Sequence, residues 1–246
     1  MAKKPTKKQA KASSKTNLVE RGLTPYRWLR KWLFRLVVIV VVVILGVIGA
    51  HSTFNPGDTF YMKSEARRLG GIDHIWVPLE DIAPVMARSV VAAEDANFCL
   101  HWGFDVEAIR AALEEGSGRG ASTISQQVVK NVYLWQGRNW LRKALEAVMT
   151  PLVEMLWSKR RIIEVYLNVA EFDEGVFGID AAAQHYFGVT PAQLSPLQAA
   201  RLAAVLPAPK GRSASKPSRL VARRAAAILD GAETIRRDGR ARCFED

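Results

Sequence analysis

The sequence predicts a mostly helical domain that follows a single N-terminal membrane-spanning helix. Three observations support this fold class. Beyond residue 80, apolar residues recur at three- and four-residue spacing, as on the buried face of a helix. No segment alternates apolar and polar residues as a half-buried strand would, and no internal repeat is visible. Residues 36–50 contain no polar side chain, and the 246-residue chain is long enough to bury one sizeable core after them.

The positive charge of the chain is concentrated near its N-terminus. The net charge is +11, but residues 1–35 hold eleven Lys and Arg against one acid, Glu20, so the rest of the chain is close to neutral. This distribution argues against a basic nucleic-acid-binding fold, and no nucleic-acid partner is expected. Basic residues beside an apolar stretch instead predict that residues 1–20 are disordered and attracted to anionic lipid head groups.

The apolar stretch is long enough to cross a bilayer if it is counted from Trp32, with Arg35 reaching toward the head groups. A cleavable signal peptide is the alternative, but its basic region would be unusually long and no clean Ala-x-Ala site follows. The positive-inside rule places the N-terminus in the cytoplasm. We therefore expect four regions in order: a basic cytoplasmic tail over 1–31, a transmembrane anchor over 32–50, a membrane-proximal connection with little regular structure over 51–79, and an exported domain over 80–246.

The exported domain begins with two predicted helices. Apolar spacing predicts a helix over 82–93, and Glu94 continues its inward stripe. A half-buried carboxylate at that position should have a raised pKa, which suits a group that accepts a proton near neutral pH. Asp105 is a good N-cap for a second helix over 105–115, which the glycine-rich residues 116–120 should end.

Residues 120–131 carry a broad polar face opposite a narrow apolar one. The polar face consists of hydroxyl, amide and ammonium side chains, namely Ser122, Thr123, Gln126, Gln127, Lys130 and Asn131. A solvated face would normally be richer in Glu, Lys and Arg. We favour a ligand-facing groove, because amides and hydroxyls bind sugar hydroxyls and peptide groups. A buried polar seam between helices is the alternative.

Residues 139–157 predict a long amphipathic helix that is kinked at Pro151. Its expected core stripe consists of Leu141, Leu145, Val148, Leu152 and Met155. On the other side Arg142, Lys143 and Glu146 lie together, and Arg142 with Glu146 alone would be an ordinary i,i+4 ion pair. The same criteria predict further helices over 159–168, in the alanine-rich stretch after Gly178, over 195–205 and over 217–237.

Residues 94–105 combine carboxylates, a histidine, aromatic residues and a glycine, which is typical of a structured loop between helices. Cys99 lies in this loop and could pair with Cys243 in an oxidising compartment; the sequence leaves the free and bonded states open. The four histidines are scattered and predict no metal site. Carboxylates, a polar groove and cations beside an acid, all on a membrane anchor, suit the transfer of a lipid-linked phospho-sugar.

Five motifs resemble those of the monofunctional biosynthetic peptidoglycan glycosyltransferases, a family similar to the glycosyltransferase domain of bifunctional class A penicillin-binding proteins. They occur in family order: Glu94-Asp95-x-x-Phe98-x-x-His101-x-Gly103-x-Asp105, Gly120-x-Ser122-Thr123-Ile124-x-Gln126-Gln127-x-x-Lys130-Asn131, Arg142-Lys143-x-x-Glu146, Lys159 through Tyr166-Leu167-Asn168, and Gly175-x-x-Gly178-Ile179-x-x-Ala182-Ala183 with Tyr186-Phe187-Gly188. The first two are long and specific. Val189 departs from the lysine that often follows the last motif.

The resemblance implies a lysozyme-like, two-lobed helical fold and polymerisation of lipid II into β-1,4-linked glycan strands for the cell wall. Transfer would invert the sugar carbon and release undecaprenyl pyrophosphate. Glu94, as the general base, and Glu146 would be catalytic. Substrate binding is implied for Ser122, Thr123, Gln126, Gln127, Lys130, Asn131, Arg142 and Lys143. A role in shaping the site is implied for Asp95, Phe98, His101, Gly103, Asp105, Tyr166, Asn168 and Gly178.

The resemblance further implies a divalent cation, Mg²⁺ or Mn²⁺, at the pyrophosphate and no organic cofactor. The expected partners are lipid II, the growing glycan strand, the membrane, and proteins of cell-wall synthesis or division. The expected location is the inner membrane, with the catalytic domain in the periplasm; no transpeptidase domain is expected. Two other functions stay open. A lysozyme-like hydrolase or lytic transglycosylase would need an acid in a groove but no cation cluster, and a membrane scaffold would need no catalysis.

Overall fold

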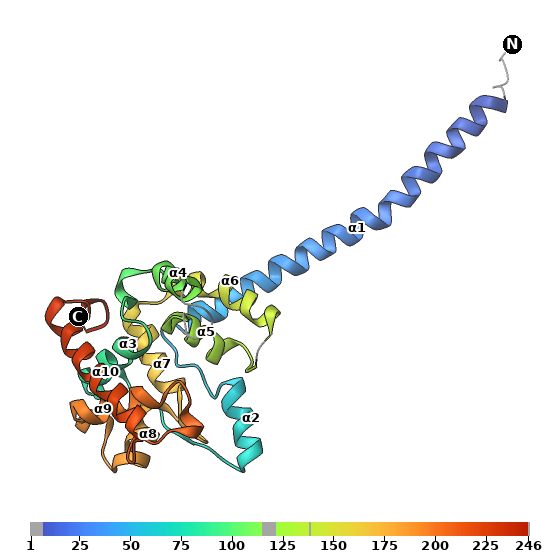
Figure 1. Ribbon diagram of the computed structural model, residues 1–246. Coiled ribbons are helices and arrows are strands. Elements are labelled where there is room, and N and C mark those ends of the chain that lie inside the picture. The colour runs from blue at the N-terminus through green and yellow to red at the C-terminus, as the bar shows by residue number, and fades with distance from the viewer. Residues whose placement is uncertain (1–6, 115–121, 138, 246) are drawn as a thin grey trace. The chain divides into compact units, whose positions relative to one another are not determined.

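The computed structural model describes residues 7–114, 122–137 and 139–245, with side chains from residue 26 onward (Figure 1). The chain divides into two compact units, Met1–Val47 and Ile48–Asp246, and each is described by itself.

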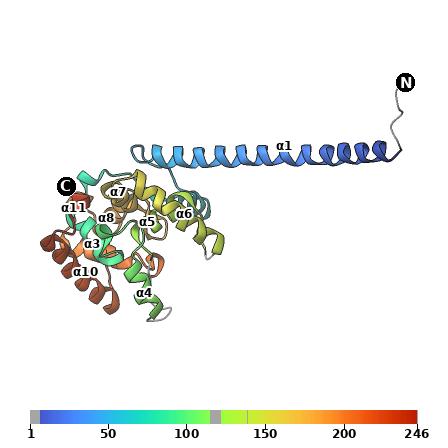
Figure 2. The same cartoon turned by 90° about the horizontal axis from the view of Figure 1, so that it is seen from above.

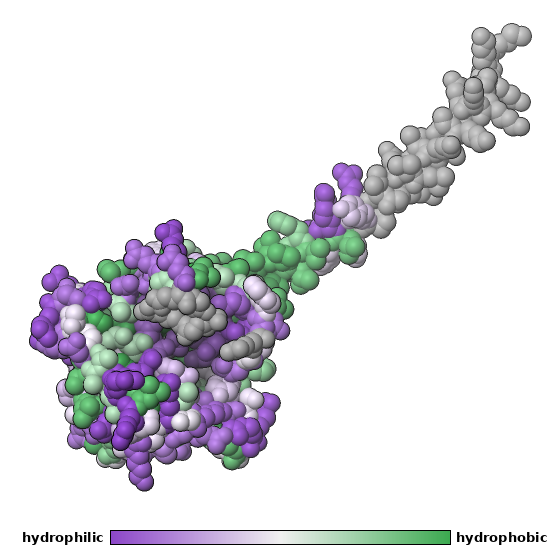
Figure 3. Space-filling model, in the orientation of Figure 1, coloured by the Kyte–Doolittle hydropathy of each residue, from purple (hydrophilic) through white to green (hydrophobic). Residues whose placement is uncertain are grey.

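The first unit consists of one long helix, α1 (Lys7–Ala50), whose last residues belong to the second unit. Its part from Tyr26 to Ala50 is long and apolar enough to cross a membrane, and the most apolar 18 residues within it have a mean hydropathy of 3.0. Figure 3 shows the exposed apolar stretch of this helix in green. The predicted disorder is wrong from Lys7 onward. Lys, Ala and Gln are good helix formers, and extending an existing helix is far easier than starting one.

The predicted connection over 51–79 contains more regular structure than expected. It includes the helix α2 (Phe60–Leu69) and the single-turn helix η1 (Leu79–Asp81). Thr59 starts α2, because its hydroxyl accepts a hydrogen bond from the backbone nitrogen of Met62 at 3.2 Å. Gly70 ends it in the left-handed conformation, with a φ of 80°. Both caps can be read in the sequence. The turn signals on either side, residues 55–58 and 70–71, favoured an irregular segment over a short helix.

From residue 84 to residue 238 the longer helices agree closely with the predicted ones, whereas the single turns and the short last helix were not predicted. The helices are α3 (Pro84–Glu94), α4 (Val106–Glu114), α5 (Ile124–Tyr133), α6 (Trp140–Leu156), α7 (Lys159–Val169), α8 (Gly178–Phe187), α9 (Pro196–Val205), α10 (Arg219–Asp238) and α11 (Arg242–Glu245), with single turns η2 (Phe98–Leu100), η3 (Pro191–Gln193) and η4 (Pro209–Gly211). The glycine-rich end predicted for α4 lies outside the described residues, and so do the first two residues of the polar-faced segment over 120–131.

Two groups of helices build the domain. α10 packs on α9 and α3, as Figure 1 shows, and Figure 2 shows α3 beside α10 from above. α5 packs on α6 and α7, while α7 also contacts α8 and α11. Residues 161–163 and 165–170 are buried, so α7 forms the centre of the core. The site described below lies where α5 and α7 approach the end of α3.

A small sheet, which the sequence analysis did not anticipate, covers one end of α7. Its strands β1 (Asp73–His74), β2 (Glu171–Asp173) and β3 (Val176–Phe177) pair in the order β1-β3-β2. β1 runs parallel to β3, and β2 runs antiparallel to it. Strands of two or three residues are too short to produce a recognisable alternation.

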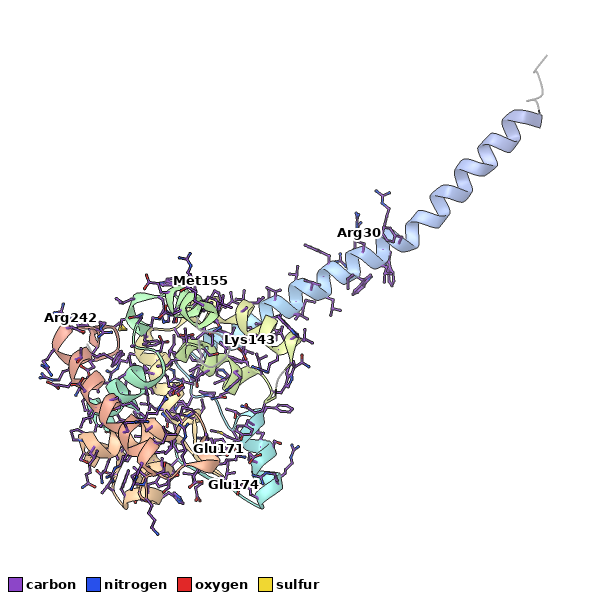
Figure 4. The ribbon with its side chains drawn as sticks, viewed as in Figure 1. Arg30, Lys143, Met155, Glu171, Glu174 and Arg242 are labelled. Carbon is purple, nitrogen blue, oxygen red and sulfur yellow. A yellow bond between two sulfur atoms is a disulfide. The ribbon has the colours of Figure 1, made fainter. Side chains whose placement is uncertain are left out.

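The long helix α6 exposes three of the five residues that were expected to form its core stripe, while Leu145 and Leu152 are partly buried against the core. Leu141, Val148 and Met155 are exposed, Val148 by 65%, and Met155 lies at the surface in Figure 4. The residues that α6 buries are instead Glu146, Thr150, Val153 and Glu154. Polar groups could be turned inward because they have partners there: the Glu154 carboxylate accepts a hydrogen bond from Ser125 and pairs with Lys159 at 2.8 Å. The helix is continuous through Pro151.

Candidate active site

Glu94 is the last residue of α3, and its side chain is only 15% exposed. Its Oε2 accepts a hydrogen bond of 3.0 Å from the Gln127 amide on α5, and Tyr166 contacts the same amide group from α7 at 3.5 Å. Burial raises the pKa of Glu94, and the hydrogen bond from Gln127 and nearby positive charges partly oppose that rise. The half-buried position and raised pKa expected from the sequence are therefore confirmed.

One cavity is lined by this carboxylate and a second by its partner Gln127. One, of about 240 Å³, is lined by Glu94 itself together with Asn97, Asp105 and Ser122. The other, of about 380 Å³, is lined by Gln127, Lys130 and Asn131 of α5, by Tyr166 of α7, and by residues 206–211 around η4. Because Gln127 lines the second cavity and hydrogen-bonds the carboxylate in the first, the Glu94–Gln127 pair lies between the two.

Three cations predicted to bind substrate lie close enough to influence one another. The pKa of Lys130 is lowered by burial and then by the charge of Arg142. The pKa of Lys143 is lowered by burial and by the charges of Arg142 and Lys130. Neighbouring cations of this kind repel each other unless an anion lies among them. Within the protein that anion is Glu146, which is almost fully buried, pairs with Arg142, and lies 2.8 Å from the Lys143 ammonium.

The pair of Arg142 and Glu146 is thus not an exposed i,i+4 pair, because the Arg142 side chain is only 12% exposed. The group also connects to the loop before α5, since the Lys143 ammonium lies 3.5 Å from the Ser122 hydroxyl. Lys130, Arg142, Lys143 and Glu146, predicted from two separate segments of the chain, therefore form one charged group, of which Lys130 lines the larger cavity.

The polar face of α5 divides between the two predicted interpretations. Gln127, Lys130 and Asn131 line the larger cavity, as a ligand-facing groove requires. Thr123 and Gln126 are buried and form the cap of the helix: Gln126 Oε1 accepts from the Thr123 backbone nitrogen at 3.0 Å, and the Gln126 nitrogen donates to Thr123 Oγ1 at 3.3 Å. Gln126 is thus used by the first turn of the helix, which begins at Ile124, and lines neither of the two cavities, whereas Thr123 also lines the smaller one.

The loop after Glu94 is held in place by the residues that were predicted to shape it. Buried Asp95 accepts hydrogen bonds from the Ile124 backbone nitrogen at 3.0 Å and from His101 at 2.7 Å. Asp105 caps α4, because its Oδ1 accepts from the Ala108 backbone nitrogen at 2.9 Å. Phe98 is completely buried under the ammonium of Lys159, 4.2 Å from its ring centroid. These contacts fix the backbone that follows the carboxylate.

Cys99 and Cys243 form a disulfide, which the sequence left open. Their Cα atoms lie 5.7 Å apart although 144 positions separate them in sequence. The bridge attaches the loop after Glu94 to α11, and Phe98 packs near Phe244 of that helix, with ring centroids 6.3 Å apart. No local pattern could have indicated this pairing.

Asn168 and Gly178, two more of the residues predicted to shape the site, fix the C-terminal end of α7. Asn168 is fully buried and binds the backbone of Val77 twice, accepting from its nitrogen and donating to its oxygen, both at 2.8 Å. Gly178 has a φ of 80°, and a Cβ there would lie 3.0 Å from the Asn168 carbonyl oxygen. Both residues hold the end of α7 and so the position of Tyr166.

Among the described residues, the carboxylates of Glu146 and of the cluster around Asp95 are already paired, and the divalent cation predicted at the pyrophosphate stays a prediction. Both oxygens of Glu146 are taken by Arg142 and Lys143. The cluster of Asp95, His101 and Asp105 has ligand atoms within 4.8 Å of one another, but its oxygens are already used by backbone and side-chain donors. Mg²⁺ usually needs one or two available carboxylates as well as phosphate oxygens. We therefore assign no step to a metal.

Sequence reasoning missed Arg224 of α10, whose guanidinium lies 3.4 Å from Glu94 Oε1. It also missed Tyr61, Glu171 and Lys210 at the far end of the larger cavity, where the Tyr61 hydroxyl donates to Glu171 at 2.6 Å. Glu171 and Glu174 lie beside α2 in Figure 4. These residues come from segments outside the five motifs, and only the fold brings them together.

Comparison with known proteins agrees with this geometry. Residues 63–233 match the family model described as Transglycosylase. The chain is 55% identical over 99% of both chains to a biosynthetic peptidoglycan transglycosylase of Jannaschia sp. (strain CCS1). It is 44% identical, over 88% of this chain and 96% of the other, to a protein of the same name from Caulobacter vibrioides.

The predicted resemblance and fold class are confirmed, and the domain from Ile48 onward is a lysozyme-like helical domain. The family model covers more than half of the chain, and the relative from Jannaschia covers nearly all of it. The chain therefore belongs to the peptidoglycan transglycosylases, glycosyltransferases that polymerise glycan chains in cell-wall biosynthesis.

Proposed function

We propose that the chain polymerises lipid II, with Glu94 as the general base. The observation that carries this proposal is the position of Glu94: a nearly buried carboxylate of raised pKa, between two cavities, with the group of Lys130, Arg142 and Lys143 beside one of them. One cavity can take an acceptor sugar and the other a donor whose diphosphate faces the cations.

The reaction then proceeds by a single displacement. Glu94 accepts the proton of the acceptor's 4-hydroxyl while that oxygen attacks C1 of the growing strand's terminal sugar. The bond between C1 and the diphosphate oxygen breaks, its electron pair leaves with undecaprenyl pyrophosphate, and the sugar carbon is inverted. A carboxyl whose pKa is raised toward neutrality takes up this proton more readily than an ordinary glutamate would. The product is a β-1,4-linked strand longer by one unit.

The cation group would stabilise the departing diphosphate. The pKa values of Lys130 and Lys143 are lowered first by burial and then by repulsion from neighbouring cations, and an incoming polyanion would relieve that repulsion. Glu146 holds Arg142 and Lys143 in place through ion pairs before the diphosphate binds. We assign Glu146 this organising role, and Ser122, Gln127 and Asn131 the binding of sugar and peptide groups.

We further propose that α1 is anchored in the inner membrane with its N-terminus in the cytoplasm and that the domain lies in the periplasm. The basic N-terminal residues support this orientation through the positive-inside rule. The disulfide between Cys99 and Cys243 suits an oxidising compartment. The apolar side chains that α4 and α6 expose suit contact with the lipid that carries the substrate: Val106, Leu113, Trp140, Leu141, Val148 and Met155.

The test is polymerisation of labelled lipid II by the full chain in detergent. Glu94→Gln should lower the rate by about 10²–10⁴-fold, because the amide cannot accept the proton, and should leave the unfolding temperature unchanged. Glu80→Gln, at an exposed glutamate, is the matched control and should be fully active. Cleavage of finished glycan without polymer would indicate the hydrolase, and unchanged polymerisation by Glu94→Gln would contradict the assignment of the base.

A further inference from the structure

Arg224 extends from α10 to the carboxylate that we assign as the base. Its Nη2 lies 3.4 Å from Glu94 Oε1 and 3.3 Å from the carbonyl oxygen of Ala93. The guanidinium therefore contacts both the side chain and the C-terminal carbonyls of α3, where a positive charge is favourable. The Nε of Arg224 is buried and has no hydrogen-bond partner among the described residues. The two contacts of Nη2 therefore determine where the guanidinium lies.

α10 and the residues after it also approach this end of α3 at two points beyond Arg224. A Cβ at Gly231 would lie 3.2 Å from the Cβ of Ala92, so the two helices nearly touch there. Beyond the helix, Arg240 donates a hydrogen bond of 2.9 Å to the carbonyl oxygen of Ala96. α10 and the residues after it thus contact the chain before, at and after Glu94, which makes the position of Arg224 relative to the carboxylate well defined.

We propose that Arg224 is a positioning residue for the transfer reaction, which holds the Glu94 carboxylate in its charged form and fixes which oxygen meets the acceptor hydroxyl. This inference rests on the proposed role of Glu94. Gln127 occupies Oε2 at 3.0 Å, whereas the longer contact of Arg224 leaves Oε1 able to accept one more hydrogen bond. We assign proton acceptance to Oε1, because its contact with Arg224 is the longer of the two.

The charges that face Glu94 come from several elements. Lys130 lies on α5, Arg212 follows η4, and Arg224 lies on α10; all three oppose the rise in pKa that burial causes, and Arg224 is the largest of these charge effects. Tyr166 of α7 and Asp95 also lie close to Glu94. Tyr166 stays neutral because burial and the charges of Glu94 and Asp95 raise its pKa. Removing Arg224 should therefore raise the pKa of Glu94 further.

The experiment compares Arg224→Met, Arg224→Lys and Arg223→Met in the full chain. Arg223 is exposed on the same helix and serves as the matched control. Arg224→Met should lower kcat for lipid II by about 10-fold or more with little change in KM, and should move the acidic limb of the kcat/KM profile upward by about 1 pH unit. Arg224→Lys should restore most of the rate, and Arg223→Met should behave as the wild type.

A second measurement does not depend on activity. Carbon-13 NMR of carboxyl-labelled glutamate, with the Glu94 signal assigned from Glu94→Gln, gives the pKa of Glu94 directly in each variant. An upward shift in Arg224→Met but not in Arg223→Met supports the proposal even if lipid II proves not to be the substrate. An unchanged pKa, or a rate lost equally at every pH together with a lower unfolding temperature, would overturn it.

Discussion

Replacing Gly103 with alanine tests how tightly the loop after Glu94 is packed against α6. Gly103 has a φ of 80°, and a Cβ there would lie 2.5 Å from Cγ2 of Thr150 and 3.1 Å from Cγ of Glu154. The left-handed backbone alone costs an L-residue about 1–2 kcal/mol. Overpacking a buried contact typically adds about 1–3 kcal/mol. Gly103→Ala should therefore destabilise the domain by about 2–5 kcal/mol.

Gly70→Ala separates the two contributions. Gly70 has the same φ of 80°, but a Cβ added there would meet no atom within 4 Å, so only the backbone contribution remains. The unfolding temperature of the full chain in detergent, followed by circular dichroism, should fall by about 5–15 °C for Gly103→Ala and by only a few degrees for Gly70→Ala.

Thr150→Ser then tests the clash itself. Serine lacks Cγ2 but keeps the hydroxyl that donates to the Glu146 carbonyl at 2.7 Å. In a double-mutant cycle, Thr150→Ser should recover about 1 kcal/mol or more in the Gly103→Ala background. Equal unfolding temperatures for Gly103→Ala and Gly70→Ala, or no coupling to Thr150→Ser, would refute the packing argument.

Three further predictions concern stability and the membrane. Cys99→Ser should lower the unfolding free energy by about 2–5 kcal/mol, and reductant should destabilise the wild type but not this variant. Hydrogen bonds from Arg68 and Lys210 lower the pKa of Glu65 to about 2, so its carboxylate stabilises the fold above pH 4.5 and loses this effect as the pH falls toward 2. Acid unfolding of Glu65→Gln should accordingly show a shallower slope in that window. Val148→Asp, at an exposed position of α6, should leave unfolding in detergent within about 0.5 kcal/mol of the wild type but reduce polymerisation in liposomes; equal activity in liposomes would argue against membrane contact there.

Local sequence signals predicted much of the fold. Ser195, Asn139 and Asp105 cap helices at or next to the expected positions, because a cap depends on a side chain and backbone groups only two or three residues away. The end of α3 at Glu94 also follows from spacing within that helix. These features need no knowledge of the rest of the chain.

The features that local signals did not predict depend on residues that are far apart in the sequence. α6 faces inward with Glu146 and Glu154 because Arg142, Lys143, Ser125 and Lys159 offer them partners, and only Arg142 and Lys143 lie within a turn of the helix. Apolar spacing alone assigns the opposite face to the core. Arg224 at the carboxylate was missed for the same reason, since 130 positions separate it from Glu94.

The disulfide also gives the domain an unusual covalent topology. Cys99 and Cys243 close a ring of chain that contains Lys130, Glu146 and Arg224, while Glu94 lies on the segment that enters it. A protease that cuts one exposed bond inside this ring opens it without releasing a fragment. The two parts would migrate as one species on a gel until a reductant is added, and the groups around Glu94 would stay attached to each other after the cut. The bridge thus protects the assembly of the site against chain breakage as well as against unfolding.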